Sequence, residues 1–124
     1  MALAKELMGV GFSAGQASGV GGQYSAVTAT GSAQTDAASL AASMSVVAGA
    51  DGTKGVILTG GVGDELWVFN NSASTLKVYP TTGAAIAVAG TGLGTANAAF
   101  SQLTYKTTIY KCVTTTQWLA NTSA

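Results

Sequence analysis

The sequence lacks the residues on which most catalytic and metal sites depend. Its 124 residues include no histidine and no arginine, and cysteine and proline each occur once. Histidine is the commonest general acid–base group, and histidine and cysteine are the usual ligands of zinc. Arginine is the main side chain that reads nucleic-acid bases. We therefore expect a protein that is not an enzyme, holds no cofactor or metal, and binds no nucleic acid.

Charge is also scarce. Five lysines balance five acidic residues, and charged residues make up only 8% of the chain. So few charges protect a surface poorly against association, which indicates that much of it contacts other protein. No run approaches the roughly 20 apolar residues of a membrane span, and Lys5 and Glu6 interrupt what would be a signal peptide. These features predict synthesis in the cytoplasm and no membrane contact.

The single Cys112 cannot form a disulfide within the chain. It lies in an apolar, β-like run, where free cysteines are most often buried. A nucleophilic cysteine would need a neighbouring base such as histidine, and the sequence has none. We therefore expect a buried, unreactive thiol.

What the sequence does contain is a series of short β-like stretches. They are separated by turns rich in glycine and recur at intervals of about 8–12 residues, which predicts an all-β fold, a small antiparallel β-sandwich or barrel. The expected β domain covers residues 23–120, and residues 121–124 form a loose tail. The predicted strands are 24–30, 38–47, 56–58, 66–69, 76–79, 85–89, 98–100, 106–113 and 117–119. In strand 38–47, the alternation places Leu40, Ala42, Met44 and Val46 on one face, which is the buried face of a half-buried strand in an antiparallel sheet. The many alanines would also suit a helix, but the alternation with serine favours a strand.

The stretch from Asp64 to Pro80 is the centre of the predicted fold. The strands 66–69 and 76–79 are joined by the polar cluster 70–72, which predicts a β-hairpin, and Pro80 ends its second strand.

Both faces of the first hairpin strand are apolar. Leu66 and Val68 share one face, and Trp67 and Phe69 share the other. A small sheet protein has only one inner face, so the second covering layer is expected from another subunit. We therefore interpret Trp67, Phe69 and Tyr79 as residues of the core or of inter-subunit packing.

Residues 1–22 are expected to form a short N-terminal arm, helical or irregular. Leu3, Leu7 and Met8 fall on one side of an amphipathic helix over residues 2–8. A helix this short is marginal in water, so it would be ordered only by docking. Two interpretations stay open, a docking arm and a frayed terminus.

Several weak motifs have simpler interpretations as loops. Residues 49–54 faintly resemble a phosphate-binding loop, but no Gly-Lys-Ser/Thr ending opens a helix. Residues 90–94 lack the third glycine of a dinucleotide fingerprint. Asp64 and Glu65 are the only adjacent carboxylates, and on a strand they would point to opposite faces. No small-molecule substrate is therefore expected.

The sequence resembles a group of small virion proteins of tailed bacteriophages. The resemblance is carried by Gly63-Asp-Glu-Leu-Trp-Val-Phe-Asn-Asn71, by Leu76-Lys-Val-Tyr-Pro-Thr-Thr-Gly83 and by Tyr110-Lys-Cys-Val-Thr-Thr-Thr-Gln-Trp118. The segment Glu6-Leu-Met-Gly-Val-Gly-Phe12 is similar to the short leader that some of these proteins carry. The group includes capsid decoration (cement) and head-fibre proteins.

This resemblance implies a β-fold that trimerises on the capsid lattice. The expected function is that of a non-enzymatic decoration protein on the outer capsid surface of the virion. It would bind the major capsid protein as a homotrimer and bridge neighbouring capsid subunits, with Leu3, Leu7 and Met8 docking on the capsid.

The alternative is a carbohydrate- or receptor-binding module of a head or tail fibre. It would use the 70–72 loop and a sugar-stacking platform drawn from Trp67, Tyr79, Tyr110 and Trp118. Aromatic residues at strand positions are more often part of the core or of an interface.

Overall fold

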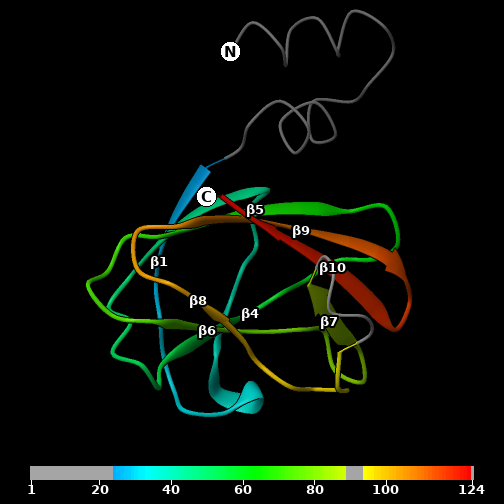
Figure 1. The fold of residues 1–124 in the computed structure, drawn as a ribbon, viewed down its shortest axis with the longest axis horizontal. Helices are drawn as coiled ribbons and strands as arrows, with labels where there is room; N and C mark the ends of the chain where they lie inside the picture. Colours follow the sequence, from blue (N-terminus) through cyan, green and yellow to red (C-terminus); the bar gives the residue numbers. More distant parts are fainter. Residues whose placement is uncertain (1–23, 89–93, 124) are drawn as a thin grey trace, which may run out of the picture.

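The computed structural model describes residues 24–88 and 94–123, so the expected N-terminal arm lies outside the described residues. This part of the chain is all-β, as predicted, with ten strands and one short 3-10 helix (Figure 1). The elements are β1 (Tyr24–Thr28), η1 (Gln34–Asp36), β2 (Ala38–Ser39), β3 (Met44–Ala48), β4 (Gly55–Ile57), β5 (Glu65–Asn70), β6 (Leu76–Tyr79), β7 (Ala85–Val88), β8 (Phe100–Gln102), β9 (Thr107–Thr114) and β10 (Gln117–Thr122). Within these ranges, no helix has the length and hydrophobicity to span a membrane.

The strands form two mixed sheets, so the expectation of a purely antiparallel arrangement is wrong. The six-stranded sheet has the order β1-β3-β5-β9-β10-β7, and the four-stranded sheet has the order β2-β4-β6-β8. From β1 to β8, each strand is followed by one in the other sheet. As a result, β1, β3 and β5 are parallel neighbours in one sheet. In the other sheet β2, β4 and β6 are parallel neighbours, and β8 is antiparallel to β6.

The first half of the chain winds as a coil of similar turns. Tyr24 pairs with Met44, and Met44 pairs with Trp67, so residues 20 and 23 positions apart lie in one row across the six-stranded sheet. Parallel strands need a long crossover, which here is a strand of the opposite sheet instead of a helix. The antiparallel hairpin of β9 and β10 lies between β5 and β7 in the six-stranded sheet. β9 pairs with β5, and β10 pairs with β7.

The predicted central hairpin does not form, although both of its strands do. β5 pairs with β3 and β9, whereas β6 pairs with β4 and β8 in the other sheet. The buried Asn70 at the end of β5 explains the change of sheet. Its Nδ2 donates to the carbonyl oxygens of Ser74 (2.9 Å) and Leu103 (3.2 Å), which ties the connection to the β8–β9 loop. β6 ends at Tyr79, immediately before Pro80, as predicted.

The predicted strand 38–47 is two strands, β2 and β3, in different sheets. Leu40 and Ala42 are buried as expected, but Met44 is 41% exposed, and Ser45 and Val47 are buried instead. The chain crosses from one sheet to the other between β2 and β3, which shifts the alternation by one residue.

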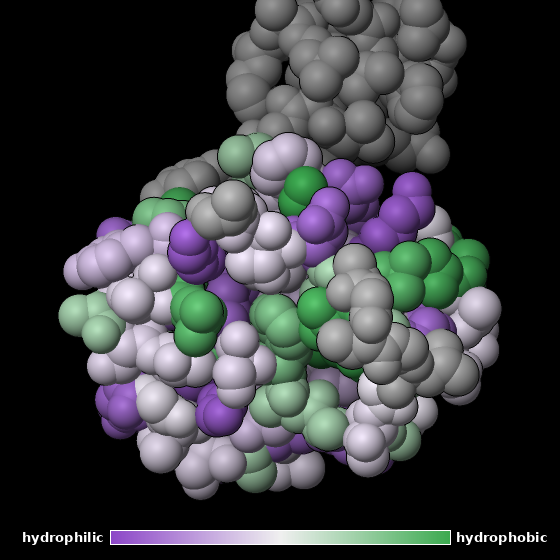
Figure 2. Space-filling view, in the orientation of Figure 1, coloured by the Kyte–Doolittle hydropathy of each residue, from purple (hydrophilic) through white to green (hydrophobic). Residues whose placement is uncertain are grey.

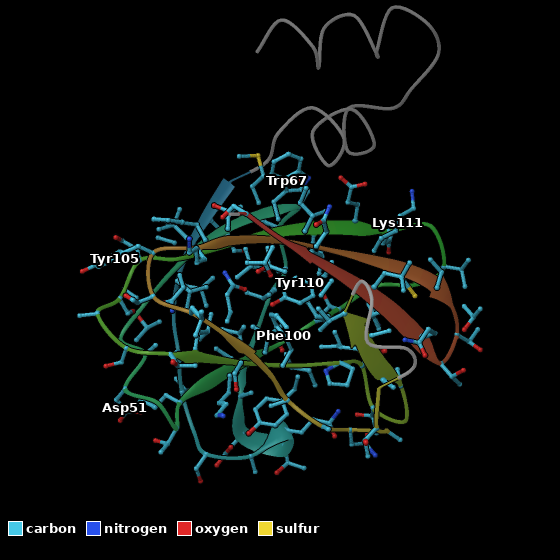
Figure 3. The ribbon with its side chains drawn as sticks, viewed as in Figure 1. Asp51, Trp67, Phe100, Tyr105, Tyr110 and Lys111 are labelled. Atoms are coloured by element: carbon cyan, nitrogen blue, oxygen red, sulfur yellow. The ribbon has the colours of Figure 1, made fainter. Side chains whose placement is uncertain are left out.

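The core lies between the two sheets and draws on both. The six-stranded sheet contributes large side chains such as Tyr110 and Trp118, and the four-stranded sheet contributes Val56 and Val78, all fully buried. Figure 3 shows Tyr110 and Phe100 between the sheets, where their rings meet edge to face with centroids 6.0 Å apart. Figure 2, which views the sheets from the side, shows hydrophobic residues gathered between them.

The C-terminal end is more ordered than expected. Strand β10 continues to Thr122, and the backbone N–H of Ser123 donates to the carbonyl oxygen of Thr107 at 2.8 Å. Residues 121–123 therefore belong to the sheet edge beside β9 and do not form a loose tail.

Candidate functional site

The two adjacent carboxylates have separate structural tasks. Asp64 accepts a hydrogen bond from the backbone N–H of Gly61 (2.8 Å) in the turn before β5, as expected for a turn residue. Glu65 begins β5 and accepts a hydrogen bond from the indole Nε1 of Trp67 at 2.9 Å. In the described part of the chain, no three His, Cys, Asp or Glu side chains gather where a metal ion could be held.

The loop that faintly resembles a phosphate site is closed by its own aspartate. Asp51 Oδ1 accepts hydrogen bonds from the backbone N–H groups of Thr53 and Lys54, both at 3.0 Å, and from the hydroxyl of Thr53 at 2.7 Å. These bonds, with the Thr53 hydroxyl first, lower the pKa of Asp51 to about 2. The N–H groups that would cradle a phosphate already bind a carboxylate, which favours the interpretation as a connecting loop.

Cys112 is buried, as predicted, on the core side of β9. Burial raises the pKa of its thiol, and the nearby negative charge of Asp64 raises it further. The thiol donates to the carbonyl oxygen of Thr114 at 3.1 Å. Because the thiolate is the reactive form, this environment makes Cys112 a packing residue and a poor nucleophile.

The most distinctive surface lies on the outer face of the six-stranded sheet. We call it the outer apolar patch and define it by Met44, Val46, Trp67, Phe69 and Ile109. Met44, Trp67 and Ile109 pair successively across β3, β5 and β9 and form one row. Met44 and Trp67 are 41% and 44% exposed, and the other three members are half-buried. Large, exposed apolar side chains that adjoin one another mark sites of interaction.

A hollow of about 330 Å³ opens beside Trp67. It is open to solvent and is lined by residues of β5, β9 and the end of β10: Trp67, Thr107, Ile109, Asn121, Thr122 and Ser123. The hydrogen bond to Glu65 fixes the orientation of the indole. Figure 3 shows Trp67 and Lys111 on the outer side of the six-stranded sheet, away from the core. Glu65 and Lys111 pair across β5 and β9 and add one charge of each sign next to Trp67 and Ile109.

The structure brings together two of the three predicted packing residues. Trp67 and Phe69 are both on the outer face of β5, with Trp67 outside the core of the chain. Tyr79 lies half-buried on β6 in the other sheet, with its hydroxyl 3.4 Å from the carbonyl oxygen of Ser32. The predicted docking residues Leu3, Leu7 and Met8 lie outside the described residues.

Sequence reasoning missed Met44 and Ile109 as neighbours of Trp67. Met44 was assigned to a buried face because the sheet change before β3 leaves no clear mark in the sequence. Ile109 was recognised as a strand residue, but its place beside Trp67 depends on pairing between segments about 40 residues apart.

The aromatic platform suggested for sugar stacking does not assemble as expected. Tyr110 and Trp118 are fully buried, and the indole N–H of Trp118 donates to the hydroxyl of Thr81 at 3.0 Å. Asn70 and Ser72 of the proposed binding loop are buried too. Of the two tryptophans, Trp67 alone is exposed.

Comparisons with known proteins do not assign the chain to a family. Neither the protein-family models, nor the curated proteins, nor the solved structures contain a match to it.

Proposed function

We propose that this protein is a non-enzymatic structural component of a phage virion, a capsid decoration (cement) protein. It binds the outer capsid surface as a homotrimer and bridges neighbouring major capsid subunits. The observation that carries the proposal is the outer apolar patch, whose row of Met44, Trp67 and Ile109 has two exposed members and lies on a sheet whose other face is already used by the core. The sequence resemblance supplies the virion context, and we further propose that the two sheets form a β-sandwich.

The proposed mechanism is burial of apolar surface between subunits. Tryptophan is the residue most enriched among interface side chains that dominate binding energy, and methionine is also enriched at interfaces. Covering the patch removes this surface from water at about 25 cal/mol per Å², less the cost of ordering the partners. A trimer that contacts several capsid subunits in this way opposes their separation. The N-terminal residues Leu3, Leu7 and Met8 are proposed to contact the capsid.

The test combines oligomeric state with capsid binding. Native mass measurement of the purified chain is expected to give a trimer, and the chain is expected to co-sediment with emptied capsids of the virus that encodes it. Trp67→Ser should reduce trimerisation at least tenfold. Leu103→Ser is the matched control, because Leu103 is 58% exposed in the β8–β9 loop outside the patch. A monomer that fails to co-sediment would refute the proposal.

One observation favours a second function, a carbohydrate-binding module of a fibre. An oriented, exposed indole beside Asn121 and Thr122 is a suitable arrangement for stacking and hydrogen bonding to a sugar ring. Binding on a glycan array that is lost in Trp67→Ala, while the thermal transition is unchanged, would favour this function. The absence of glycan binding together with capsid co-sedimentation would exclude it.

A further inference from the structure

The outer apolar patch lies close to the point where the N-terminal segment joins the sheet. Tyr24, the first described residue, pairs with Met44 and therefore belongs to the same row as Trp67 and Ile109. Adjacent strands are about 4.8 Å apart, so the backbone at Trp67 and Ile109 lies about 10 and 14 Å from that at Tyr24. The chain thus enters the sheet at the end that carries the hollow beside Trp67.

The first twelve residues have a composition suited to such a patch. They include Leu3, Leu7, Met8 and Phe12, and their only charges are one lysine and one glutamate. The eleven residues between Phe12 and Tyr24 span at most about 40 Å, well beyond the 10–14 Å required. A tethered segment also acts at an effective concentration in the millimolar range, so a weak contact is enough to keep it bound.

We propose that residues 1–12 of the same chain bind across the outer apolar patch in the free subunit, with an apolar side chain in the hollow beside Trp67. Trp67 and Ile109 supply the apolar walls of this hollow. Glu65 and Lys111, which lie two positions from Trp67 and Ile109 along β5 and β9, are opposite in charge to the lysine and the glutamate of the segment. The short tether favours the chain's own segment over that of a second copy.

This inference concerns the free subunit and goes beyond the proposed function. If this inference and the proposed function both hold, the capsid and neighbouring subunits must displace residues 1–12 before they bind the patch. Assembly would then be coupled to release of the segment, and the patch would stay covered until a partner is present.

The two tryptophans make the inference measurable. Trp118 is fully buried and Trp67 is 44% exposed in the described part of the chain, so the exposure of Trp67 to acrylamide reports on the patch. At a concentration at which native mass measurement shows the monomer, the full-length chain is compared with a full-length variant carrying Leu3→Ser, Leu7→Ser and Phe12→Ser. We expect both tryptophans to resist quenching in the parent chain. In the variant, about half of the emission, that of one tryptophan of two, should become quenchable, with a shift to longer wavelength.

A matched control replaces Ala2, Ala4 and Ala14 by serine and should retain the protection of Trp67. Trp67→Phe in each background isolates the Trp118 signal, which should be equal in all of them. Equal quenching of Trp67 in the parent and in the Leu3/Leu7/Phe12 variant would overturn the inference. Protection that disappears on dilution from 100 µM to 1 µM would overturn it as well, because the occupant would then be another copy. Capsid co-sedimentation is measured separately, so failure of the proposed function can be distinguished from failure of this inference.

Discussion

The hydrogen bond between Tyr110 and Gln102 offers a direct test of how the two sheets are held together. Both side chains are fully buried, and the Tyr110 hydroxyl donates to Gln102 Oε1 at 2.7 Å. Gln102 Nε2 donates to the carbonyl oxygens of Val68 and Lys106, both at 2.8 Å. Gln102 belongs to β8, whereas Val68 and Tyr110 belong to β5 and β9. This one amide therefore links the four-stranded sheet to two strands of the other sheet.

Tyr110→Phe removes the hydroxyl and leaves Gln102 Oε1 buried without that donor. An unsatisfied buried polar group costs about 1–3 kcal/mol. For a chain of this length, a loss of 1 kcal/mol lowers the Tm by about 4 °C, so the expected decrease is about 4–12 °C. Thermal unfolding followed by circular dichroism measures it, and urea unfolding at constant m-value checks that the folded state is otherwise unchanged.

Tyr79→Phe is the matched control, because it removes the same atom from a tyrosine whose hydroxyl makes only a long, exposed contact with Ser32. Its expected effect is within about 0.5 kcal/mol, as is usual for surface substitutions. If Tyr110→Phe destabilises the chain no more than Tyr79→Phe, the assignment of Gln102 as a link between the sheets is wrong.

Three further predictions follow from buried groups and from one close backbone approach. Burial raises the pKa of Tyr110 well above its usual value, so at high pH the folded chain keeps a proton that the unfolded chain loses. The free energy of unfolding should therefore fall as pH rises above about 10, and it should fall less steeply in Tyr110→Phe. Cys112 should react with a thiol reagent at least tenfold more slowly in the native chain than in urea, and equal rates would contradict its burial. Gly55→Ala places a Cβ 2.5 Å from the carbonyl oxygen of Lys77 and should destabilise the chain by about 2 kcal/mol or more, whereas Gly61→Ala, which meets nothing within 4 Å, should not.

The sequence was sufficient to locate most strands, because their positions depend on local composition. Runs such as 66–69 and 76–79 combine β-branched and aromatic residues, and glycine-rich turns flank many of the strands. The pairing of the strands was not predictable in the same way. A polar cluster between two strands indicates a hairpin by default, and the burial of Asn70, which sends the chain to the other sheet, depends on contacts with residues more than 30 positions away.

The candidate site shows the same division between local and long-range information. Trp67 was recognisable from the apolar pattern of its own strand, and the structure places it on the outer face as alternation requires. Its neighbours Met44 and Ile109 come from strands 23 positions before it and 42 positions after it, one parallel and one antiparallel to β5. No local signal specifies such a row, because the row depends on the register between distant strands. A shift of one residue in either pairing would turn Met44 or Ile109 toward the core.

The coiled winding also explains why an apolar row can occur on an outer face. Each turn of the coil returns to the six-stranded sheet beside the previous turn, so Met44 and Trp67 occupy equivalent positions in successive turns. An apolar residue at that position in several turns creates a continuous stripe rather than scattered exposed side chains. Isolated exposed apolar residues need no explanation, but a stripe aligned by the register of the sheet exposes contiguous apolar surface, which marks an interaction site. The alignment of Met44, Trp67 and Ile109 is thus stronger support for a binding surface than the exposure of any one of them.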